Sequence, residues 1–428
     1  MTRQAEHLFL EESELIGAKL CRSALWSGGR CYWEDDFLEV VENKRSVVRR
    51  PVAPDVYFGA SGIALFLAAL YSLAPEKQFR SAAEGSARLT LTQIDELDPR
   101  FPVGFYIGHL GIAFALMRLG EAFADENLIT GALRVVRRVG ERDDAAQGLD
   151  VLSGVAGAIP ALLTLHEKYP DGPSLDLAVS YGERLVRHAS EGDGDSLPAG
   201  AEDARPGARP HTGFSHGDAG VAWALLELAS ATGEERFSAA AGKIFRAQRT
   251  WFELLRRRLR DREETPAQDR RHSFSWCNGA VGLAVSRLRA YELTREQIYR
   301  DEAETALTTT LEALRRPGGG SDYSICHGIA GAGDAFMYAA EVLNEVGYRD
   351  AAVEKGLEGI EQVRRKGLPW PCGSVWGGET LNLMQGVAGI GYFYLRLHDP
   401  VKTPPLAIIL PDRGRRLTPR RPRPRPVN

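Results

Sequence analysis

The chain has 428 residues, of which 44% are hydrophobic and 26% charged, as in an ordinary soluble globular protein. This composition excludes a mainly disordered, collagen-like or membrane-embedded chain. The 57 acidic and 53 basic residues leave a net charge of −4, which argues against a general nucleic-acid-binding surface.

Cysteine usage and the N-terminal residues indicate the compartment. Five cysteines are too few and too scattered in a long chain for a disulfide framework. The N-terminus MTRQAEHLFLEESE lacks the apolar run of a signal peptide, and no window approaches the ~18 apolar residues of a membrane helix. We therefore expect a cytoplasmic protein with free thiols, no transmembrane segment and no nucleic-acid partner.

A repeated element follows an amphipathic helix predicted at residues 11–26. Two glycines separated by two residues, followed by an apolar run, recur seven times at spacings of 46 to 63 residues. The first glycines are Gly59, Gly108, Gly154, Gly217, Gly279, Gly328 and Gly386. Seven such elements at quasi-regular spacing indicate a repeat architecture, which a single glycine pair would not.

The apolar runs predict helices that are buried on most sides, because their hydrophobicity does not fall off on one face. Amphipathic stretches such as residues 126–142, 175–192 and 348–367 lie between them and predict outer helices. Strand signals are nearly absent. The sequence therefore predicts an all-α fold, a closed α/α toroid of about seven helical hairpins with inner and outer rings, in which all the glycine turns meet at one end.

Candidate metal ligands stand beside the glycines of repeats five and six. Cys277 and Cys326 each lie two residues before the first glycine, and His327 follows Cys326 directly. Three such ligands leave a fourth position open, which is the pattern of a catalytic zinc, one ion per chain. The alternative is two small buried cysteines and a hydrogen-bonded core histidine.

Two further polar residues occupy related positions in the preceding repeats. His216 lies directly before Gly217, and Asp150 lies four residues before Gly154. Their place in the repeat predicts that both face the rim that carries the cysteines, as catalytic groups. Taken singly, each could instead be a helix cap or a core hydrogen-bonding group, and His216 could be a fourth metal ligand.

Across residues 10–412 these motifs resemble the lanthionine synthetase C-like cyclases. The similar segments are YFGASGIALFLAAL near the start, LDVLSGVAG at 149–157, GFSHGDAG at 213–220, SWCNGAVG at 275–282, CHGIAG at 326–331 and LMQGVAGIGYFYLRL at 383–397. The resemblance implies an α/α toroid with a central zinc and thioether formation between a peptide cysteine and a dehydroalanine or dehydrobutyrine. It also implies that Cys277, Cys326 and His327 hold the zinc, and that His216 and Asp150 are catalytic.

Two positions depart from the pattern of some family members. Asn278 stands where they have a tyrosine after the first zinc cysteine, and Ser273 stands where they have an arginine. The repeats fill residues 1–412, so the dehydrated precursor peptide is expected to come from a separate dehydratase or a kinase/lyase protein. Residues 413–428 form a basic Pro/Arg-rich tail that we expect to be disordered, the alternative being a contact with an acidic leader peptide or a partner enzyme.

The expected reaction follows from thiol chemistry. Coordination to Zn²⁺ deprotonates a thiol, and the resulting thiolate adds to the β-carbon of the dehydroamino acid. His216 is the candidate acid that protonates the enolate, with Asp150 orienting the imidazole or taking the thiol proton. Three alternatives remain open: a thiol-alkylating zinc enzyme of the prenyltransferase type, an enzyme that adds glutathione or another thiol, and a non-catalytic peptide-binding scaffold that partners a dehydratase.

Overall fold

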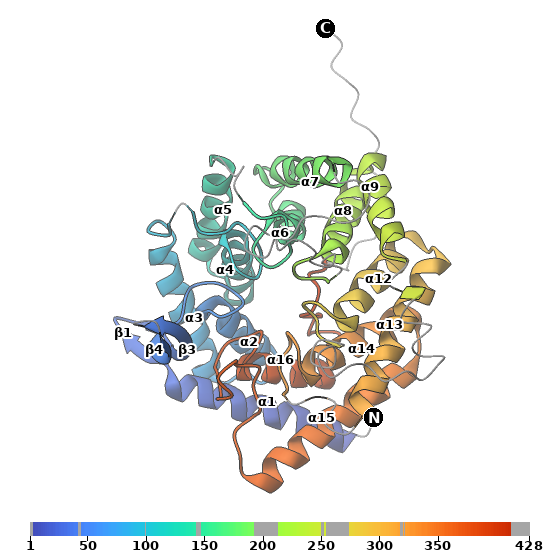
Figure 1. Cartoon of the computed structure of the whole chain (residues 1–428). Helices are drawn as coiled ribbons and strands as arrows, with labels where there is room; N and C mark the ends of the chain where they lie inside the picture. Colours follow the sequence, from blue (N-terminus) through green and yellow to red (C-terminus); the bar gives the residue numbers. More distant parts are fainter. Residues whose placement is uncertain are drawn as a thin grey trace.

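The computed structural model describes residues 3–411 except 42–43, 99, 143–146, 192–212, 250–251, 254–273, 317–319 and 321. Its helices form two concentric rings (Figure 1). The inner ring contains α2 (Ala60–Leu73), α4 (His109–Phe123), α6 (Val155–Lys168), α8 (Asp218–Thr232), α12 (Ala280–Thr294), α14 (Ile329–Leu343) and α16 (Val387–His398). The outer ring contains α1 (Arg3–Ser23), α3 (Lys77–Gln93), α5 (Glu126–Gly140), α7 (Ser174–Glu191), α9 (Glu235–Ala247), α13 (Gln297–Arg315) and α15 (Val346–Lys366). The predicted α/α toroid is confirmed.

The first and last helices of the chain pair with each other and close the ring. Each inner helix from α2 to α14 packs against the outer helix that follows it, whereas α16 packs against α1. Ser13 Oγ in α1 donates to the carbonyl oxygen of Gly391 in α16 at 3.0 Å. The helix predicted at residues 11–26 is therefore the outer half of the seventh hairpin, and it spans Arg3–Ser23.

Helix burial follows the two types of apolar pattern. Every residue of α8 from Asp218 to Leu228 is buried. In α5, by contrast, burial recurs at steps of three and four residues, as an amphipathic outer helix requires. The inner helices thus pack on both the outer ring and the interior of the toroid, which explains why their sequences are apolar on all sides.

The second glycine of each repeat is required by a close backbone approach. Its Cα lies against the carbonyl oxygen of the residue six positions earlier, as Gly282 does with Trp276 and Gly331 with Ile325. A Cβ at either position would overlap that oxygen. Each inner helix therefore begins directly after the first glycine and folds back onto its own turn.

The seven glycine turns are joined by a closed ring of backbone hydrogen bonds. In each repeat an amide near the turn donates to the carbonyl two residues before the next repeat's first glycine. The bonds are Tyr57 N–Tyr106 O (2.8 Å), Ile107 N–Leu152 O (2.9 Å), Leu152 N–Ser215 O (3.1 Å), Ser215 N–Cys277 O (3.0 Å), Trp276 N–Cys326 O (2.9 Å), Cys326 N–Met384 O (2.9 Å) and Met384 N–Tyr57 O (3.3 Å). The last bond returns to the first repeat. Residues at this register are therefore brought together although they lie far apart in the sequence.

Residues 25–51 contain strands that the sequence did not predict. β1 (Leu25–Ser27) pairs with β2 (Arg30–Tyr32), and β3 (Glu34–Val41) pairs with β4 (Lys44–Pro51), both antiparallel. The β3–β4 hairpin is tied to the toroid by Asp35, which accepts hydrogen bonds from Thr380 Oγ1 and, at 2.8 Å, from Leu381 N. Valines, arginines and acids alternate in these strands, so most of their side chains are at least partly exposed and the apolar pattern is weak.

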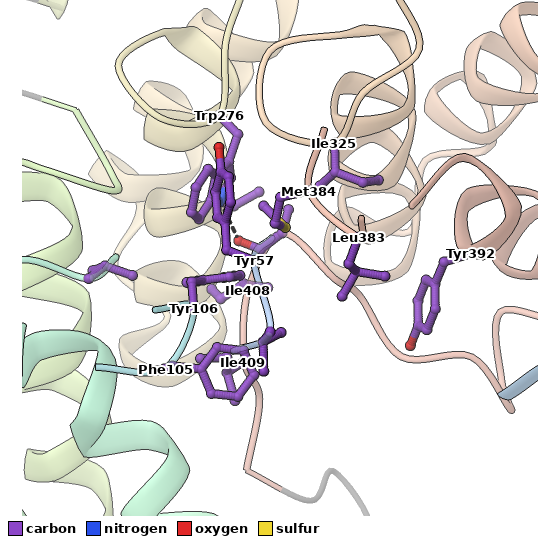
Figure 2. Packing of buried hydrophobic residues seen from close by; sticks show 14 of the residues in the cluster. Tyr57, Phe105, Tyr106, Trp276, Ile325, Leu383, Met384, Tyr392, Ile408 and Ile409 are labelled. Carbon is purple, nitrogen blue, oxygen red and sulfur yellow. Dashed lines mark hydrogen bonds between the residues drawn. The ribbon is translucent and has the colours of Figure 1, made fainter. Parts of the chain in front are cut away.

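The C-terminal segment from Pro405 to Ile409 lies inside the toroid, where Ala407, Ile408 and Ile409 are buried (Figure 2). Trp276 Nε1 donates to the Ala407 carbonyl at 2.7 Å, and Tyr106 Oη donates to the Leu406 carbonyl at 3.1 Å. Because Tyr106 and Trp276 belong to the second and fifth repeats, the segment bridges distant parts of the inner ring.

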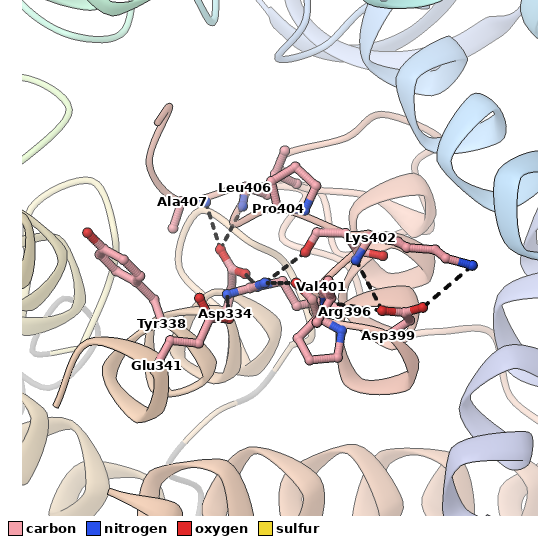
Figure 3. Close-up of polar contacts among 12 residues, drawn as sticks. Asp334, Tyr338, Glu341, Arg396, Asp399, Val401, Lys402, Pro404, Leu406 and Ala407 are labelled. Carbon is pink, nitrogen blue, oxygen red and sulfur yellow. Dashed lines mark hydrogen bonds and ion pairs between the residues drawn. The ribbon is translucent and has the colours of Figure 1, made fainter. Parts of the chain in front are cut away.

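A buried ion pair holds the same segment from the other side (Figure 3). Asp334 Oδ1 lies 2.8 Å from Arg396 Nε, and Asp334 Oδ2 accepts from the amides of Leu406 and Ala407 at 2.9 and 2.7 Å. Asp334 and Arg396 are 1% and 0% exposed, so the Asp334 carboxylate depends on Arg396, which is paired in addition with Glu341 at 2.7 Å.

No helix within the described ranges has the length and apolarity needed to cross a membrane.

Candidate functional site

The candidate site lies at the glycine turns, and the turns share one capping device. In five repeats the side chain four residues before the first glycine accepts a hydrogen bond from the amide three residues later. The pairs are Asp55–Phe58 (2.7 Å), Asp150–Ser153 (2.8 Å), Ser275–Asn278 (3.3 Å), Ser324–His327 (3.3 Å) and Asn382–Gln385 (2.8 Å). These short polar side chains hold the turn in the conformation that starts the helix. Four of the five predicted site residues, Asp150, Cys277, Cys326 and His327, lie in or at such turns, as does Asn278.

Cys277 and Cys326 come together at the centre of the ring. Both occupy the register two residues before the first glycine, and their thiols interact. The interaction with Cys326, helped by the Ser275 hydroxyl and the nearby His327 and His216, lowers the pKa of Cys277 to about 6 despite its burial. The same interaction and full burial raise the pKa of Cys326 well above its ordinary value. Cys277 is therefore the first of the two thiols to ionise.

His327 follows Cys326 and is oriented by a loop between repeats six and seven. Its Nε2 lies 3.0 Å from the carbonyl oxygen of Gly373. A carbonyl oxygen only accepts, so Nε2 carries hydrogen, and Nδ1 of the neutral imidazole keeps the lone pair. A Cβ at Gly373 would run into the His327 ring, which explains why glycine stands there. Cys372, the neighbour of Gly373, contacts the Thr380 carbonyl through its sulfur at 3.8 Å and takes no part in the thiol pair.

His216 and Asp150 form a pair across repeats three and four. Asp150 Oδ2 lies 3.0 Å from His216 Nδ1, while Asp150 Oδ1 accepts from the amides of Ser153 and Gly154, both at 2.8 Å. Burial alone would raise the pKa of Asp150, but the hydrogen bonds from His216 and the turn outweigh it and lower the pKa. The carboxylate therefore has two functions: one oxygen caps the turn, and the other orients an imidazole that is 42% exposed.

Cys277, Cys326 and His327 are side chains of the kinds that bind zinc, but their present arrangement is not that of a zinc site. Within the described ranges no three His, Cys, Asp or Glu side chains are grouped closely enough to hold a metal ion. The two thiols are nevertheless in contact, and the Gly373 carbonyl fixes His327 in the tautomer that keeps Nδ1 available. Metal-binding histidines commonly donate their other ring N–H to such a carbonyl. Zinc binding would require Cys277, Cys326 and His327 to close onto the ion.

Other positions noted in the sequence do not join this group. Asn278, which replaces the tyrosine of some family members, is exposed at the turn. Ser273, the segments 190–212 and 255–272 and the tail 413–428 lie wholly or almost wholly outside the described residues.

The sequence interpretation missed two polar side chains at the thiol pair. Burial and the nearby Cys326 and Cys277 thiols raise the pKa of Tyr57 well above its ordinary value, and Gln385 Nε2 donates to the Tyr57 hydroxyl at 3.4 Å. Tyr57 shares the register of the two cysteines, and Gln385 shares the register of His216 and His327. Their positions within the repeat were the signal by which Tyr57 and Gln385 could have been identified from the sequence.

Comparison with known proteins identifies a family and a similar fold. The family model described as lanthionine synthetase C-like protein matches residues 50–408. The fold is similar to that of nisin cyclase, with a TM-score of 0.61 and 19% identity over 82% of this chain and 89% of that one. The Lin0763 protein of Listeria innocua (TM-score 0.47, 13% identity, 91% and 96% covered) and an unsaturated glucuronyl hydrolase from Streptococcus agalactiae (0.47, 14%, 94% and 93%) are more distant.

A search of curated protein sequences finds no match. The family model covers well over half of the chain, including all seven glycine turns. The chain therefore belongs to the lanthionine synthetase C-like family.

Proposed function

We propose that this protein is a zinc-dependent cyclase that forms (methyl)lanthionine rings in a dehydrated precursor peptide. Family membership supports a reaction of this type. The observation that supports it most is the contact between Cys277 and Cys326 at the centre of the ring, with His327 beside Cys326 and the His216–Asp150 pair in the neighbouring turns. Cys277, Cys326 and His327 would hold the ion, leaving one position for a substrate sulfur.

The chemistry divides between the ion and the side chains of this chain. Zinc would lower the pKa of the substrate cysteine, so that its sulfur is a thiolate at neutral pH. The new C–S bond forms at the β-carbon of the dehydroamino acid, and the α-carbon must then accept a proton. The proton lost by the thiol and the proton gained by carbon balance, so no oxidant or cosubstrate is needed.

His216 is placed to handle that proton. Asp150 is held ionised by the hydrogen bonds from His216 and from its turn and accepts from Nδ1, so Nε2 is the ring nitrogen on the side away from the carboxylate. A histidine oriented in this way can pass a proton to carbon through Nε2, and the carboxylate stabilises the imidazolium that precedes the transfer. Asp150 thus acts through His216 and not on the substrate.

The domain and its partners follow from the same proposal. We assign the cyclase domain to residues 1–412 and treat 413–428 as a separate basic tail. The substrate is a precursor peptide dehydrated by a separate dehydratase or kinase/lyase protein, and the reaction takes place in the cytoplasm.

Metal content of the purified protein, measured beside Cys326→Ala, is the decisive experiment. The expected result is one zinc per wild-type chain and its loss from the variant, together with loss of ring formation. His216→Ala should keep the zinc and lose cyclisation, and loss of zinc from it would make His216 a ligand instead. Freshly purified wild-type protein without zinc would refute the proposal and favour a peptide-binding scaffold.

Product mass separates cyclisation from addition of an external thiol. Ring closure leaves the mass of the dehydrated peptide unchanged and removes its free thiols. Addition of glutathione increases the mass by one glutathione per dehydroamino acid. A reaction mixture containing both a cysteine-bearing dehydrated peptide and glutathione should yield the unchanged mass.

A further inference from the structure

The β3–β4 hairpin has an open edge along its basic strand, β4. Within the described ranges its sheet contains these two strands, so each strand has an outer side on which no further strand pairs. Figure 1 shows the hairpin at the periphery of the toroid. An open edge carries backbone N–H and C=O groups with which an extended peptide can form a further strand.

The hydrogen-bond pattern of the hairpin determines which backbone groups of β4 face outward. Val52 N donates to the Trp33 carbonyl at 3.0 Å, and these two residues continue the register of the hairpin. Hydrogen-bonded and non-hydrogen-bonded pairs alternate in an antiparallel ladder, so the backbone groups of Arg45, Val47 and Arg49 point away from β3. All three residues are exposed. β4 therefore offers a row of three outward amides.

The outer edge of β3 is less open than that of β4. The Asp36 amide faces outward by the same alternation, but it already donates to Asp35 Oδ1 at 3.0 Å. Asp35 in turn is bound to the toroid through Thr380 and Leu381. An added strand is therefore better accommodated along β4.

The charges of the hairpin indicate which peptide fits this edge. β4 has basic residues near both ends and no acidic residue, whereas β3 has four acidic residues. Arg49 Nε lies 3.2 Å from Asp36 Oδ1, and Arg50 Nε lies 2.7 Å from Glu39 Oε1. The Arg49 side chain is nevertheless 67% exposed, so a carboxylate on its other side can still reach it. β4 is thus suited to an acidic strand on each side.

The same charges disfavour a second copy of this chain as the occupant. Two β4 strands paired antiparallel about Val47 would place Arg45 of each copy opposite Arg49 of the other. Like charges directly opposite each other destabilise a pair of strands. The occupant that fits is therefore an acidic peptide.

The hairpin is attached to the end of the toroid that carries the candidate site. β4 ends at Pro51, four residues before Asp55, which caps the glycine turn of repeat one. Asp35 in β3 accepts from Thr380 and Leu381, which directly precede the capping residue of the turn of repeat seven. A peptide paired with β4 is therefore bound to an element that is anchored at two of the glycine turns.

We propose that the outer edge of β4 binds an acidic, extended segment of the precursor peptide as a third strand. The identity of the peptide rests on the proposed function. Backbone hydrogen bonds to Arg45, Val47 and Arg49 hold the segment, its carboxylates pair with the two arginines, and its apolar side chains pack beside Val47, which is 51% exposed. The bound segment keeps the rest of the peptide near the end of the toroid at which rings are closed.

A fluorescein-labelled peptide with the sequence of β3, EDDFLEVV, is the probe, because β3 shows which side chains pair with β4. Fluorescence anisotropy gives its dissociation constant for the full-length protein. Val47→Pro removes an outward amide and leaves the hydrogen bonds to β3 in place. Leu38→Pro is the matched control, because Leu38 pairs directly with Val47 and its amide faces the opposite edge. Denaturant unfolding confirms that each variant is folded.

We expect Val47→Pro to weaken binding of the probe by about tenfold, and Leu38→Pro to leave it unchanged. The uncharged analogue QNNFLQVV should bind more weakly than the probe, as should the probe to the double variant Arg45→Gln, Arg49→Gln, which keeps every backbone amide. Added salt should weaken binding of the acidic probe. In ring closure on a dehydrated precursor peptide, Val47→Pro should raise KM and leave the rate at saturation unchanged.

Wild-type protein that does not bind the probe, or folded Val47→Pro protein that binds it as tightly as wild type, overturns the inference. A wild-type dimer in sedimentation that Val47→Pro dissociates also overturns it, because a second copy then occupies the edge. Wild-type protein that binds the probe but closes no rings overturns the proposed function instead, so the two failures are distinct.

Discussion

Asp150→Asn separates the two functions of this carboxylate. The amide oxygen of asparagine can take the place of Oδ1 and keep the hydrogen bonds from Ser153 and Gly154. The amide nitrogen then replaces Oδ2 and presents a donor to His216 Nδ1, where a charged acceptor stood at 3.0 Å. The turn should therefore survive, while the orientation of the imidazole and the support of its charged form are lost.

The expected loss of folding stability and the expected loss of reaction rate differ in size. A hydrogen bond between charged groups contributes about 1.5–3 kcal/mol when buried, and His216 is 42% exposed, so the loss of folding stability should be about 1 kcal/mol or less. Proton transfer by a positioned side chain contributes about 10²–10⁴-fold to a rate. We expect the single-turnover rate of ring closure to fall by about that factor, or about 3–5 kcal/mol in activation free energy.

The assay is ring closure on a dehydrated peptide under single-turnover conditions, followed by the loss of free thiol, with zinc content and denaturant unfolding measured on the same samples. Asp150→Asn protein that retains zinc and closes rings within a few-fold of the wild-type rate would refute the assignment of His216–Asp150 as the proton-transfer pair. Protein that is largely unfolded would show that the turn, and not the imidazole, depends on the carboxylate.

Asp55→Asn is the matched control, because Asp55 caps the equivalent turn of repeat one and, among the described residues, has no hydrogen bond to a histidine. Burial raises the pKa of Asp55 to about 6, against 3.8 for an ordinary aspartate. The stability associated with its protonated form is complete below about pH 4 and is lost as pH rises through 6. The difference of about 2 corresponds to about 3 kcal/mol. Relative to wild type, Asp55→Asn should therefore gain stability between pH 4 and 6, reach a plateau above, and leave ring closure unaffected.

Two further substitutions test the fold. Gly331→Ala places a methyl group against the Ile325 carbonyl oxygen and should destabilise the protein by about 1–3 kcal/mol or more. Gly140→Ala, at the end of α5 where the methyl group meets open space, should be neutral or stabilising by up to about 1 kcal/mol. Equal denaturant midpoints for the two variants would refute the close-approach argument. Arg396→Met leaves Asp334 buried without its 2.8 Å partner and should cost about 3–5 kcal/mol in denaturant unfolding, and a loss below about 1 kcal/mol would show that the C-terminal segment does not depend on this pair.

The ring could be predicted from the sequence because its repeat unit is local. A glycine turn, a buried helix and an amphipathic helix each have a short-range signature, and the all-round apolarity of the seven buried helices indicates a closed ring. The β3–β4 hairpin could not be predicted in this way, because its strands are mostly exposed and alternate charges with valines. The path of Pro405–Ile409 through the toroid also has no signature in the local amino-acid sequence. It depends on Asp334, Trp276 and Tyr106, which belong to three different repeats.

The same reasoning explains which part of the site could be predicted. Equivalent positions in the repeats converge, so Cys277, Cys326, His327, His216 and Asp150 could all be assigned to one end of the ring by register alone. The position of a residue within its repeat does not determine which side chains contact one another across the centre of the ring. The side chain of Gln385 in the last repeat donates to the hydroxyl of Tyr57 in the first repeat, beside the backbone bond from Met384 to Tyr57 that closes the ring.

The glycine turn carries both the side chains that start the inner helices and the side chains of the candidate site. Asp55 and Asp150 occupy the same position and cap equivalent turns, yet of these two only Asp150 has a hydrogen bond to a histidine in the described part of the chain. Ser275 and Ser324 cap their turns with a hydroxyl, each two residues before a cysteine. The same turn therefore starts a helix in each of these repeats and also offers positions at which a ligand or an acid can be placed. Because the side chains at these positions differ from turn to turn while the backbone ring stays the same, a test of function at this site should compare substitutions at matched turns, such as Asp150 and Asp55.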